Sequence, residues 1–184
     1  MRGRLELNVT YAARRPWVPR RAQFVTWANA ALFGATQLGA AQLGAAQLGA
    51  AQLGAAQLGA AQATAARDAT CFVISVRVVG AGRSRSLNAR YRHKDRPTNV
   101  LSFSGAGMIP DGRNFLGELV ICAPVVAHEA RTQAKAAAAH WAHMTVHGVL
   151  HLLGFDHERT AEARKMAARE IQILDRLGFS NPYA

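Results

Sequence analysis

The stretch His147-Gly-Val-Leu-His-Leu-Leu-Gly-Phe-Asp-His157 organises this chain of 184 residues. On a helix, His147 and His151 are four residues apart, so both imidazoles lie on one face with Cβ atoms roughly 5–6 Å apart. Gly154 can adopt the left-handed backbone that ends a helix, and the chain can then turn and bring His157 toward the same point. Three neutral imidazoles with an open fourth position are typical of a catalytic zinc site, because structural sites usually close that position.

Two histidines four residues apart are by themselves a weak signal, since a surface pair or a pair packed on a neighbouring helix has the same spacing. The full spacing is similar to the H-E-x-x-H-x-x-G-x-x-H pattern of metzincin proteases. In those proteases the glutamate after the first histidine activates the metal-bound water. Here that position is Gly148, so peptide hydrolysis by that mechanism is disfavoured.

Two neighbours of the three histidines are candidates for supporting roles. His143 falls on the same helix face one turn before His147, where it can contact a ligand or substrate, or simply pack. Asp156 lies between the hinge glycine and the third histidine. It can orient a histidine by accepting its N–H, or fix the turn through its own backbone. The sequence leaves both alternatives open.

The chain is strongly basic, with 22 Lys and Arg against 11 Asp and Glu, a net charge of +11 and a pI near 11.2. This balance favours a polyanionic partner, nucleic acid first and an anionic membrane surface second; the alternative is a merely solvated basic surface. Cys71 and Cys122 sit in apolar runs, which predicts buried thiols rather than a disulfide. No apolar run reaches the roughly 18 residues of a membrane helix, so we expect a cytoplasmic protein.

Hydrophobic patterning predicts an α+β domain with a single mixed β-sheet of about four strands and helices on its faces. We expect strands over 5–11, 71–79, 97–103 and 115–122, with a loop over 105–114. We expect helices from residue 20 or 21 onward, over 87–91, 124–135, 137–153 and 158–177. In the first of these helices, the expected core residues are Phe24, Trp27, Ala28 and Ala31.

Residues 34–62 repeat Gln-Leu-Gly-Ala-Ala with a period of five. On an α-helix, successive leucines would step round by about 140°, so no continuous apolar stripe results. The segment is interpreted as a low-complexity insertion, without a chemical role, in a single domain spanning 1–184. A weak helical extension and a small β-solenoid remain alternatives.

A basic segment spans residues 83–96, with Tyr91 interleaved. Basic side chains beside an aromatic ring suit contact with phosphates and bases, although a solvated basic helix has the same composition. The RNA-binding candidates are Arg83, Arg85, Arg90, Lys94 and Arg96.

From residue 71 onward the chain closely resembles the YbeY endoribonucleases, the bacterial rRNA maturation factors. The matching motifs are Leu87-Asn-x-x-Tyr-Arg92, Lys94-Asp-x-Pro-Thr-Asn-Val-Leu-Ser-Phe103, Leu116-Gly-Glu-Leu-Val-Ile-Cys122, the histidine stretch and the tail Leu177-Gly-Phe-Ser-Asn-Pro-Tyr183. The resemblance implies a zinc-dependent endoribonuclease that favours single strands. It also implies a role in small-subunit rRNA maturation and ribosome quality control, with association with ribosomal components. It implies His147, His151 and His157 as metal ligands and Arg92 as the functionally important arginine.

The expected chemistry is metal-assisted cleavage of a phosphodiester by one Zn²⁺ per chain, without a small-molecule cofactor or a membrane partner. Arg92 would offset charge that builds on the phosphate oxygens. One rival interpretation is a metalloprotease-like hydrolase; another is an RNA-binding ribosome assembly factor whose zinc is chiefly structural. Direct hydrolysis and attack by the RNA 2′-hydroxyl both remain open at this point.

Overall fold

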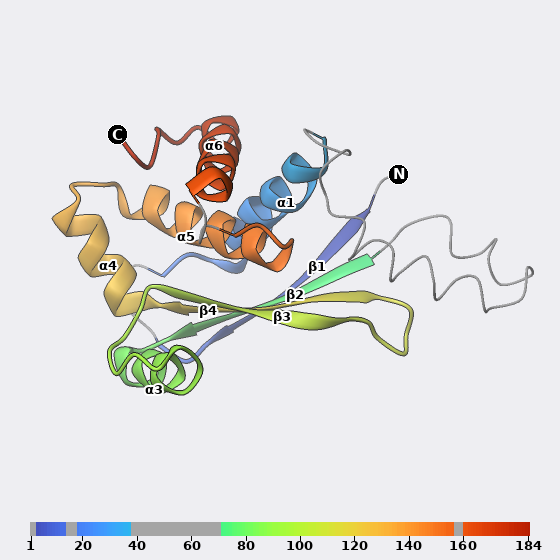
Figure 1. Cartoon of the computed structure of the whole chain (residues 1–184), viewed down its shortest axis with the longest axis horizontal. Coiled ribbons are helices and arrows are strands. Elements are labelled where there is room, and N and C mark those ends of the chain that lie inside the picture. The colour runs from blue at the N-terminus through green and yellow to red at the C-terminus, as the bar shows by residue number, and fades with distance from the viewer. Residues whose placement is uncertain (1–2, 14–17, 38–70, 157–159) are drawn as a thin grey trace, which may run out of the picture.

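The computed structural model describes residues 3–13, 18–37, 71–156 and 160–184 (Figure 1). In chain order its elements are β1 (Arg4–Tyr11), α1 (Arg21–Gln37), β2 (Cys71–Val79), α3 (Ala81–Arg92), β3 (Val100–Met108), β4 (Asn114–Cys122), α4 (Ala123–Thr132), α5 (Ala137–Leu152) and α6 (Thr160–Arg176). Strands and helices follow one another in the predicted order.

The four described strands form one sheet in the order β1-β2-β4-β3. β2 pairs in parallel with β1 and with β4, and β3 pairs antiparallel with β4. The predicted α+β class with a single mixed sheet of four strands is therefore confirmed. β3 is one edge of this sheet, which becomes important for the site.

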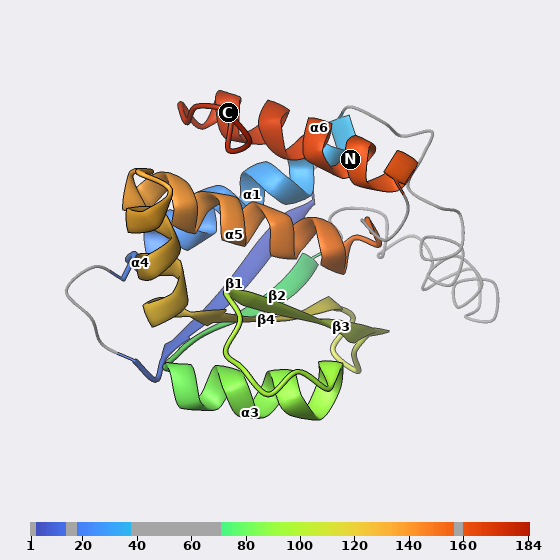
Figure 2. The ribbon, with the colours of Figure 1, turned by 60° about the vertical axis from the view of Figure 1, so that its left-hand side comes forward.

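The two faces of the sheet are covered unequally: α3 lies on one face, while α1, α5 and α6 lie on the other (Figure 2). Neighbouring residues of a strand point to opposite faces, so Leu119 and Ile121 of β4 join the larger core, and Val120 joins a smaller cluster beneath α3. The sheet thus separates a thin layer carrying the basic segment from a thick layer carrying the histidines.

Aromatic side chains hold α5 against α1. The Phe24 ring meets the Trp27 ring at a centroid distance of 5.7 Å and the Trp141 ring at 5.9 Å, both edge to face. The predicted core residues Phe24, Trp27, Ala28 and Ala31 are all buried, as expected. Most residues of α5 from His140 to Leu152 are also buried, so packing fixes the direction of its histidine-bearing face.

Two predicted boundaries were wrong. The helix expected over 87–91 is α3, which begins directly after β2, and the loop expected from residue 105 is still part of β3. From the sequence, Gly82 and Gly105 suggest interruptions of regular secondary structure. Gly105 instead allows a close strand approach, since a Cβ there would lie 2.2 Å from the Phe115 carbonyl oxygen. The antiparallel pairing with β4 continues past an irregularity between Ser104 and Gly107.

Three other expectations concern the cysteines, the repeat and the membrane. Cys71 is half-buried, Cys122 is buried, and both thiols are free. Residues 38–62 of the repeat lie outside the described residues, so its interpretation as an insertion stays a prediction. In the described part of the chain, no helix combines the length and the apolar character needed to cross a bilayer.

Candidate metal centre

Four histidines line one face of α5, at positions 140, 143, 147 and 151. Spacings of three and four residues place side chains above one another on a helix. The ring centroids of successive histidines are 6.2, 6.2 and 4.6 Å apart along this row. The closest pair, His147 and His151, is the one that the sequence predicted to share a metal ion.

The two Nε2 atoms of His147 and His151 lie 3.1 Å apart. Nitrogen ligands about 2.0–2.1 Å from a tetrahedral zinc ion are themselves about 3.3 Å apart. Both side chains are half-buried, so one side of the pair remains accessible. The chemistry and spacing of this pair therefore fit two ligands of one zinc ion.

Glu170 of α6 holds the other nitrogen of His147. The Nδ1 atom of His147 lies 2.7 Å from Glu170 Oε1, and the Glu170 side chain is fully buried. An ionised carboxylate only accepts hydrogen bonds, so the His147 proton is on Nδ1 and Nε2 is the unprotonated nitrogen, 3.1 Å from His151 Nε2. A carboxylate that orients a ligating imidazole in this way is a common feature of metal sites.

Glu170 accepts two further hydrogen bonds through Oε2. One comes from His143 Nε2 at 3.3 Å, and the other comes from the Tyr183 hydroxyl. Burial alone would raise the pKa of Glu170, but the hydrogen bonds from His143, His147 and Tyr183 outweigh it and lower that pKa to about 2. Burial and the neighbouring carboxylate raise the pKa of Tyr183. At neutral pH the carboxylate is ionised and the tyrosine is a donor.

The same three groups offer an alternative location for an ion. One donor atom each from His143, His147 and Glu170 lies within 4.8 Å of the others, and two imidazoles with a carboxylate are a known zinc ligand set. The chain therefore carries a His/Glu cluster that could hold a metal ion. The hydrogen-bond distances within the cluster favour a supporting role for Glu170, because a bound ion would have to replace the imidazole protons.

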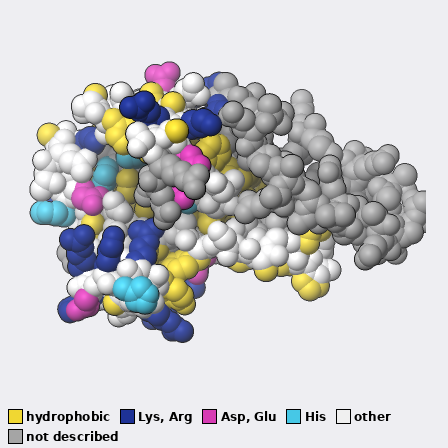
Figure 3. All heavy atoms as spheres, in the orientation of Figure 1, with side chains coloured by type: hydrophobic (Ala, Val, Ile, Leu, Met, Phe, Trp, Pro, Cys, Tyr) yellow, Lys and Arg dark blue, Asp and Glu magenta, His cyan; other side chains and the backbone are white. Residues whose placement is uncertain are grey.

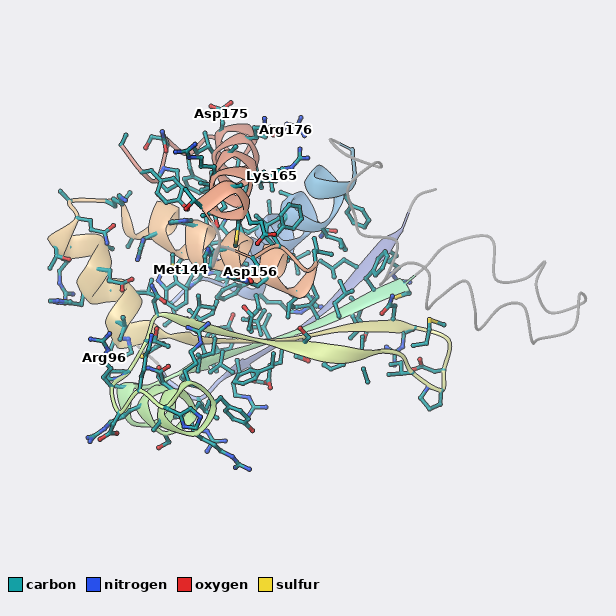
Figure 4. The ribbon with its side chains drawn as sticks, in the orientation of Figure 1. Arg96, Met144, Asp156, Lys165, Asp175 and Arg176 are labelled. Carbon is teal, nitrogen blue, oxygen red and sulfur yellow. The ribbon has the colours of Figure 1, made fainter. Side chains whose placement is uncertain are left out.

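The C-terminal end of α5 has the predicted glycine turn. Gly154 has a φ of 87°, and the Phe155 N–H donates to the Leu150 carbonyl at 3.0 Å, a common way to close a helix end. Figure 4 shows Asp156 just beyond this turn, where it is exposed. The third predicted ligand, His157, lies outside the described residues.

Gly148 occupies the position of the metzincin glutamate, and its surroundings leave little room for a side chain. A Cβ at this position would lie 2.8 Å from Leu119 Cδ2, and the Ser102 hydroxyl donates to the Gly148 carbonyl at 3.3 Å. Leu119 is fully buried, so position 148 faces the packed sheet. A glutamate here would meet the core of the protein.

The predicted catalytic arginine, Arg92, ends α3 on the other face of the sheet. β3 links the two faces, because Ser102 contacts α5 and the next residue, Phe103, packs on Tyr91 with ring centroids 5.0 Å apart. Arg92 is exposed and lies beside Tyr91 at this edge. Arg92 and the histidines of α5 therefore lie on opposite faces of the sheet, with β3 between them.

The basic residues gather over α3 and the loop after it, as Figure 3 shows for this face of the molecule. Two buried polar side chains hold this loop on α3. The Thr98 N–H donates to the Ser84 hydroxyl at 3.0 Å, and the Asn88 amide donates to the Arg96 carbonyl at 2.7 Å. Figure 4 places Arg96 on this loop. These two hydrogen bonds fix the position of the loop, and with it the basic side chains that the loop carries, relative to α3.

The predicted RNA-binding side chains differ in their surroundings. Arg85 donates two hydrogen bonds of 2.6 Å to Asp95, which compensates its charge. The Arg90 guanidinium lies 5.4 Å from the centre of the Tyr91 ring. The remaining candidates, Arg83, Lys94 and Arg96, are exposed.

A second carboxylate–histidine pair anchors the start of α5. The Nε2 atom of His140 lies 2.8 Å from Glu129 Oε2, and the Asn99 amide donates to both Glu129 oxygens at 3.2–3.3 Å. Burial raises the pKa of Glu129, but the bonds from His140 and Asn99 outweigh it and lower that pKa overall. This network ties α4, α5 and the loop before β3 together.

Sequence reasoning missed Glu170 and Tyr183. Glu170 had a detectable signal, because it falls on the apolar side of α6 with Met166, Ile173 and Leu174, all buried. A carboxylate on such a face needs a buried partner. Tyr183 ends a tail motif that matches the family, but that motif did not indicate which residue Tyr183 contacts.

The fold and these residues define an α+β protein with a histidine cluster of metal-ligand type on one helix, beside a basic surface at the edge of a mixed sheet. A profile of the family described as Endoribonuclease YbeY matches residues 49–178. The chain belongs to the YbeY endoribonuclease family.

Two curated relatives are similar in sequence over nearly the whole length of the chain. The Endoribonuclease YbeY of Nitrosococcus oceani is 38% identical over 97% of each chain. That of Stenotrophomonas maltophilia is 42% identical over 98% of this chain and 94% of its own. The solution structure of TM1509 from Thermotoga maritima is 18% identical, with a TM-score of 0.49 over 94% of this chain and 89% of its own.

Proposed function

We propose that this protein is a zinc-dependent endoribonuclease that cuts single-stranded RNA during small-subunit rRNA maturation and ribosome quality control. Family membership supports the endoribonuclease activity, because the relatives carry that name. One observation carries the metal part of the proposal. The His147 and His151 Nε2 atoms lie 3.1 Å apart while His147 Nδ1 is committed to buried Glu170.

In this proposal His147, His151 and His157 hold the zinc ion. His157 is assigned as the third ligand from the sequence spacing and the family resemblance, because it lies outside the described residues. Zinc held by these residues would lower the pKa of water and act as a Lewis acid toward a phosphate oxygen.

The chain's own groups prepare this site. Glu170 keeps the His147 proton on Nδ1, and His143 shares the same carboxylate. Asp156 remains a candidate for orienting a ligand histidine or for fixing the turn. The described part of the site presents no carboxylate in the position of the metzincin general base, because Gly148 faces the sheet.

RNA would cross the β3 edge, with the histidine pair on one side and the basic surface on the other. Arg92 would contact the phosphate and offset its developing charge. Arg83, Lys94 and Arg96 would bind flanking phosphates, with weaker contributions from Arg85 and Arg90, which already have partners. Tyr91 is 54% exposed and offers a ring on which a base can stack, as single strands allow.

The test is cleavage of a doubly end-labelled, single-stranded small-subunit rRNA fragment by purified full-length protein. We expect chelation to stop cleavage, zinc to restore it, and His151→Ala to abolish it. Arg92→Ala should lower kcat/KM by about 10²-fold, in the range of one lost transition-state donor. Arg4→Ala removes an exposed arginine at the opposite edge of the sheet and should leave cleavage unchanged.

Other outcomes would point elsewhere. Cleavage that survives chelation would indicate a contaminating nuclease. RNA binding without cleavage by the zinc-loaded protein would favour an assembly factor with structural zinc. Loss of zinc in His143→Ala but not in His151→Ala would move the ion to the His143, His147 and Glu170 cluster. A 2′,3′-cyclic phosphate end would show attack by the RNA 2′-hydroxyl instead of water.

A further inference from the structure

The C-terminal tail returns to the histidine cluster after α6 ends. The Phe179 N–H donates to the Leu174 carbonyl at 2.9 Å, and the Phe179 ring packs on Trp27. Farther along, Lys135 donates to the Pro182 carbonyl. The tail is therefore fixed at Phe179 and at Pro182, and Figure 1 shows it beside α6 and over α5.

This path of the tail brings Tyr183 into contact with Glu170. Its hydroxyl donates to Glu170 Oε2, and its ring lies edge to face with His143 at a centroid distance of 5.5 Å. The residue is nonetheless 55% exposed. A large side chain that leaves half its surface in water contributes little core packing here, so the bond to Glu170 is its most specific interaction.

The geometry of the Glu170 carboxylate explains what this bond achieves. Oε2 receives His143 and Tyr183, while Oε1 receives only His147 Nδ1 at 2.7 Å among the hydrogen bonds described. Two donors on one oxygen fix the rotation of the carboxylate, and that rotation aims the other oxygen at His147. The His147 proton is then held on Nδ1, and Nε2, which lies 3.1 Å from His151 Nε2, stays unprotonated.

We propose that Tyr183 is a positioning residue of the metal centre, acting through Glu170 to hold His147 in the tautomer that binds metal. This inference rests on the proposed role of His147 and His151 as zinc ligands. It adds a tail residue, distant from the histidine helix in sequence, to the groups that set metal affinity.

The experiment compares full-length wild type with Tyr183→Phe, Tyr183→Leu and a matched control, Tyr11→Phe. Tyr11 is also exposed, and its hydroxyl bonds the Pro19 carbonyl away from the cluster. Zinc affinity would be measured by competition with a chromophoric chelator. The His147 tautomer in metal-free protein would be read from long-range ¹H–¹⁵N NMR correlations of the ring, and folding from urea unfolding.

We expect Tyr183→Phe to weaken zinc binding about 3- to 10-fold, less than the 10- to 100-fold typical of a direct partner of a ligand. It should also reduce the Nδ1–H population of His147, and lower the urea midpoint modestly because buried Glu170 loses one of its three donors. Tyr183→Leu should match Tyr183→Phe if the hydroxyl is what matters, and Tyr11→Phe should match wild type in affinity and tautomer.

Two results would overturn the proposal in distinguishable ways. If Tyr183→Phe keeps wild-type zinc affinity and tautomer while His151→Ala loses zinc, the ligand assignment stands and Tyr183 has no positioning role. If His151→Ala keeps wild-type zinc affinity, the ligand assignment itself is wrong and the inference fails with it.

Discussion

At the scale of single residues, Glu170 is the group on which the candidate site depends. It is fully buried and accepts hydrogen bonds from His143, His147 and Tyr183. A buried carboxylate costs several kcal/mol in desolvation unless its partners compensate. The hydrogen bonds from these three side chains supply that compensation.

Glu170→Gln preserves the size of this side chain but turns one acceptor oxygen into a donor. That donor would face an N–H or O–H, so we expect the metal-free protein to lose about 1–3 kcal/mol of unfolding free energy. Zinc affinity should fall about 10- to 100-fold. Urea unfolding and chelator competition would measure both effects.

The control is Glu162→Gln, the same change at an exposed position of α6. It should alter neither quantity measurably. Wild-type zinc affinity in Glu170→Gln would show that the carboxylate neither binds the ion nor orients its ligands.

At the scale of elements, α5 lies unusually close to the sheet at Gly148. The glycine has no side chain to separate the helix from Leu119, and Ser102 bonds its carbonyl. This close approach sets the height of the histidine pair above the β3 edge. Close packing on Leu119 leaves little room for a glutamate at position 148. The site therefore lacks the general base that this glutamate provides in metzincins.

Gly148→Ala should destabilise the protein by about 1–3 kcal/mol, because the added Cβ overlaps a packed leucine. Gly82→Ala in α3 is the matched control, since an added Cβ there meets nothing within 4 Å. It should stabilise the protein by about 0.4–1 kcal/mol by restricting the unfolded chain. Urea midpoints of the two variants should therefore move in opposite directions; movement of both in the same direction would contradict the packing argument.

The element scale also shows where sequence patterns stopped being informative. The histidine helix, the apolar strands and the core face of α1 follow from periodicities of 3.6 and 2, and each appears in the structure. The extents of α3 and β3 were underestimated, because Gly82 and Gly105 read as breaks. Only the pairing of β3 with β4 shows that Gly105 belongs to a strand.

At the scale of the whole molecule, the net charge is +11, and a group of basic side chains lies over α3 and the loop after it. Single-stranded nucleic acid binding weakens with salt in proportion to the phosphates neutralised, with a slope of about −0.7 per contact. Replacing Arg83, Lys94 and Arg96 together by alanine should therefore make the slope of log K against log salt shallower by about 2. Fluorescence anisotropy of a labelled single strand, in chelator, would measure it.

A triple variant of Arg4, Arg20 and Arg176 removes the same charge from exposed positions on β1, before α1 and on α6. Its slope should remain near that of wild type. Equal slopes for both triple variants would mean that RNA senses only the total charge and has no preferred path.

The sequence by itself determined the histidine helix, its glycine end, the mixed sheet and the basic character of the chain. These features depend on residues close together along the chain or on composition. The family resemblance added the expected activity and Arg92. Tertiary structure alone decided that Glu170 bonds both His147 and Tyr183, and that β3 contacts α5 on one face of the sheet and α3 on the other. Those contacts join residues far apart in sequence, and only the packing of α6, the tail and the edge strand determines which of them meet.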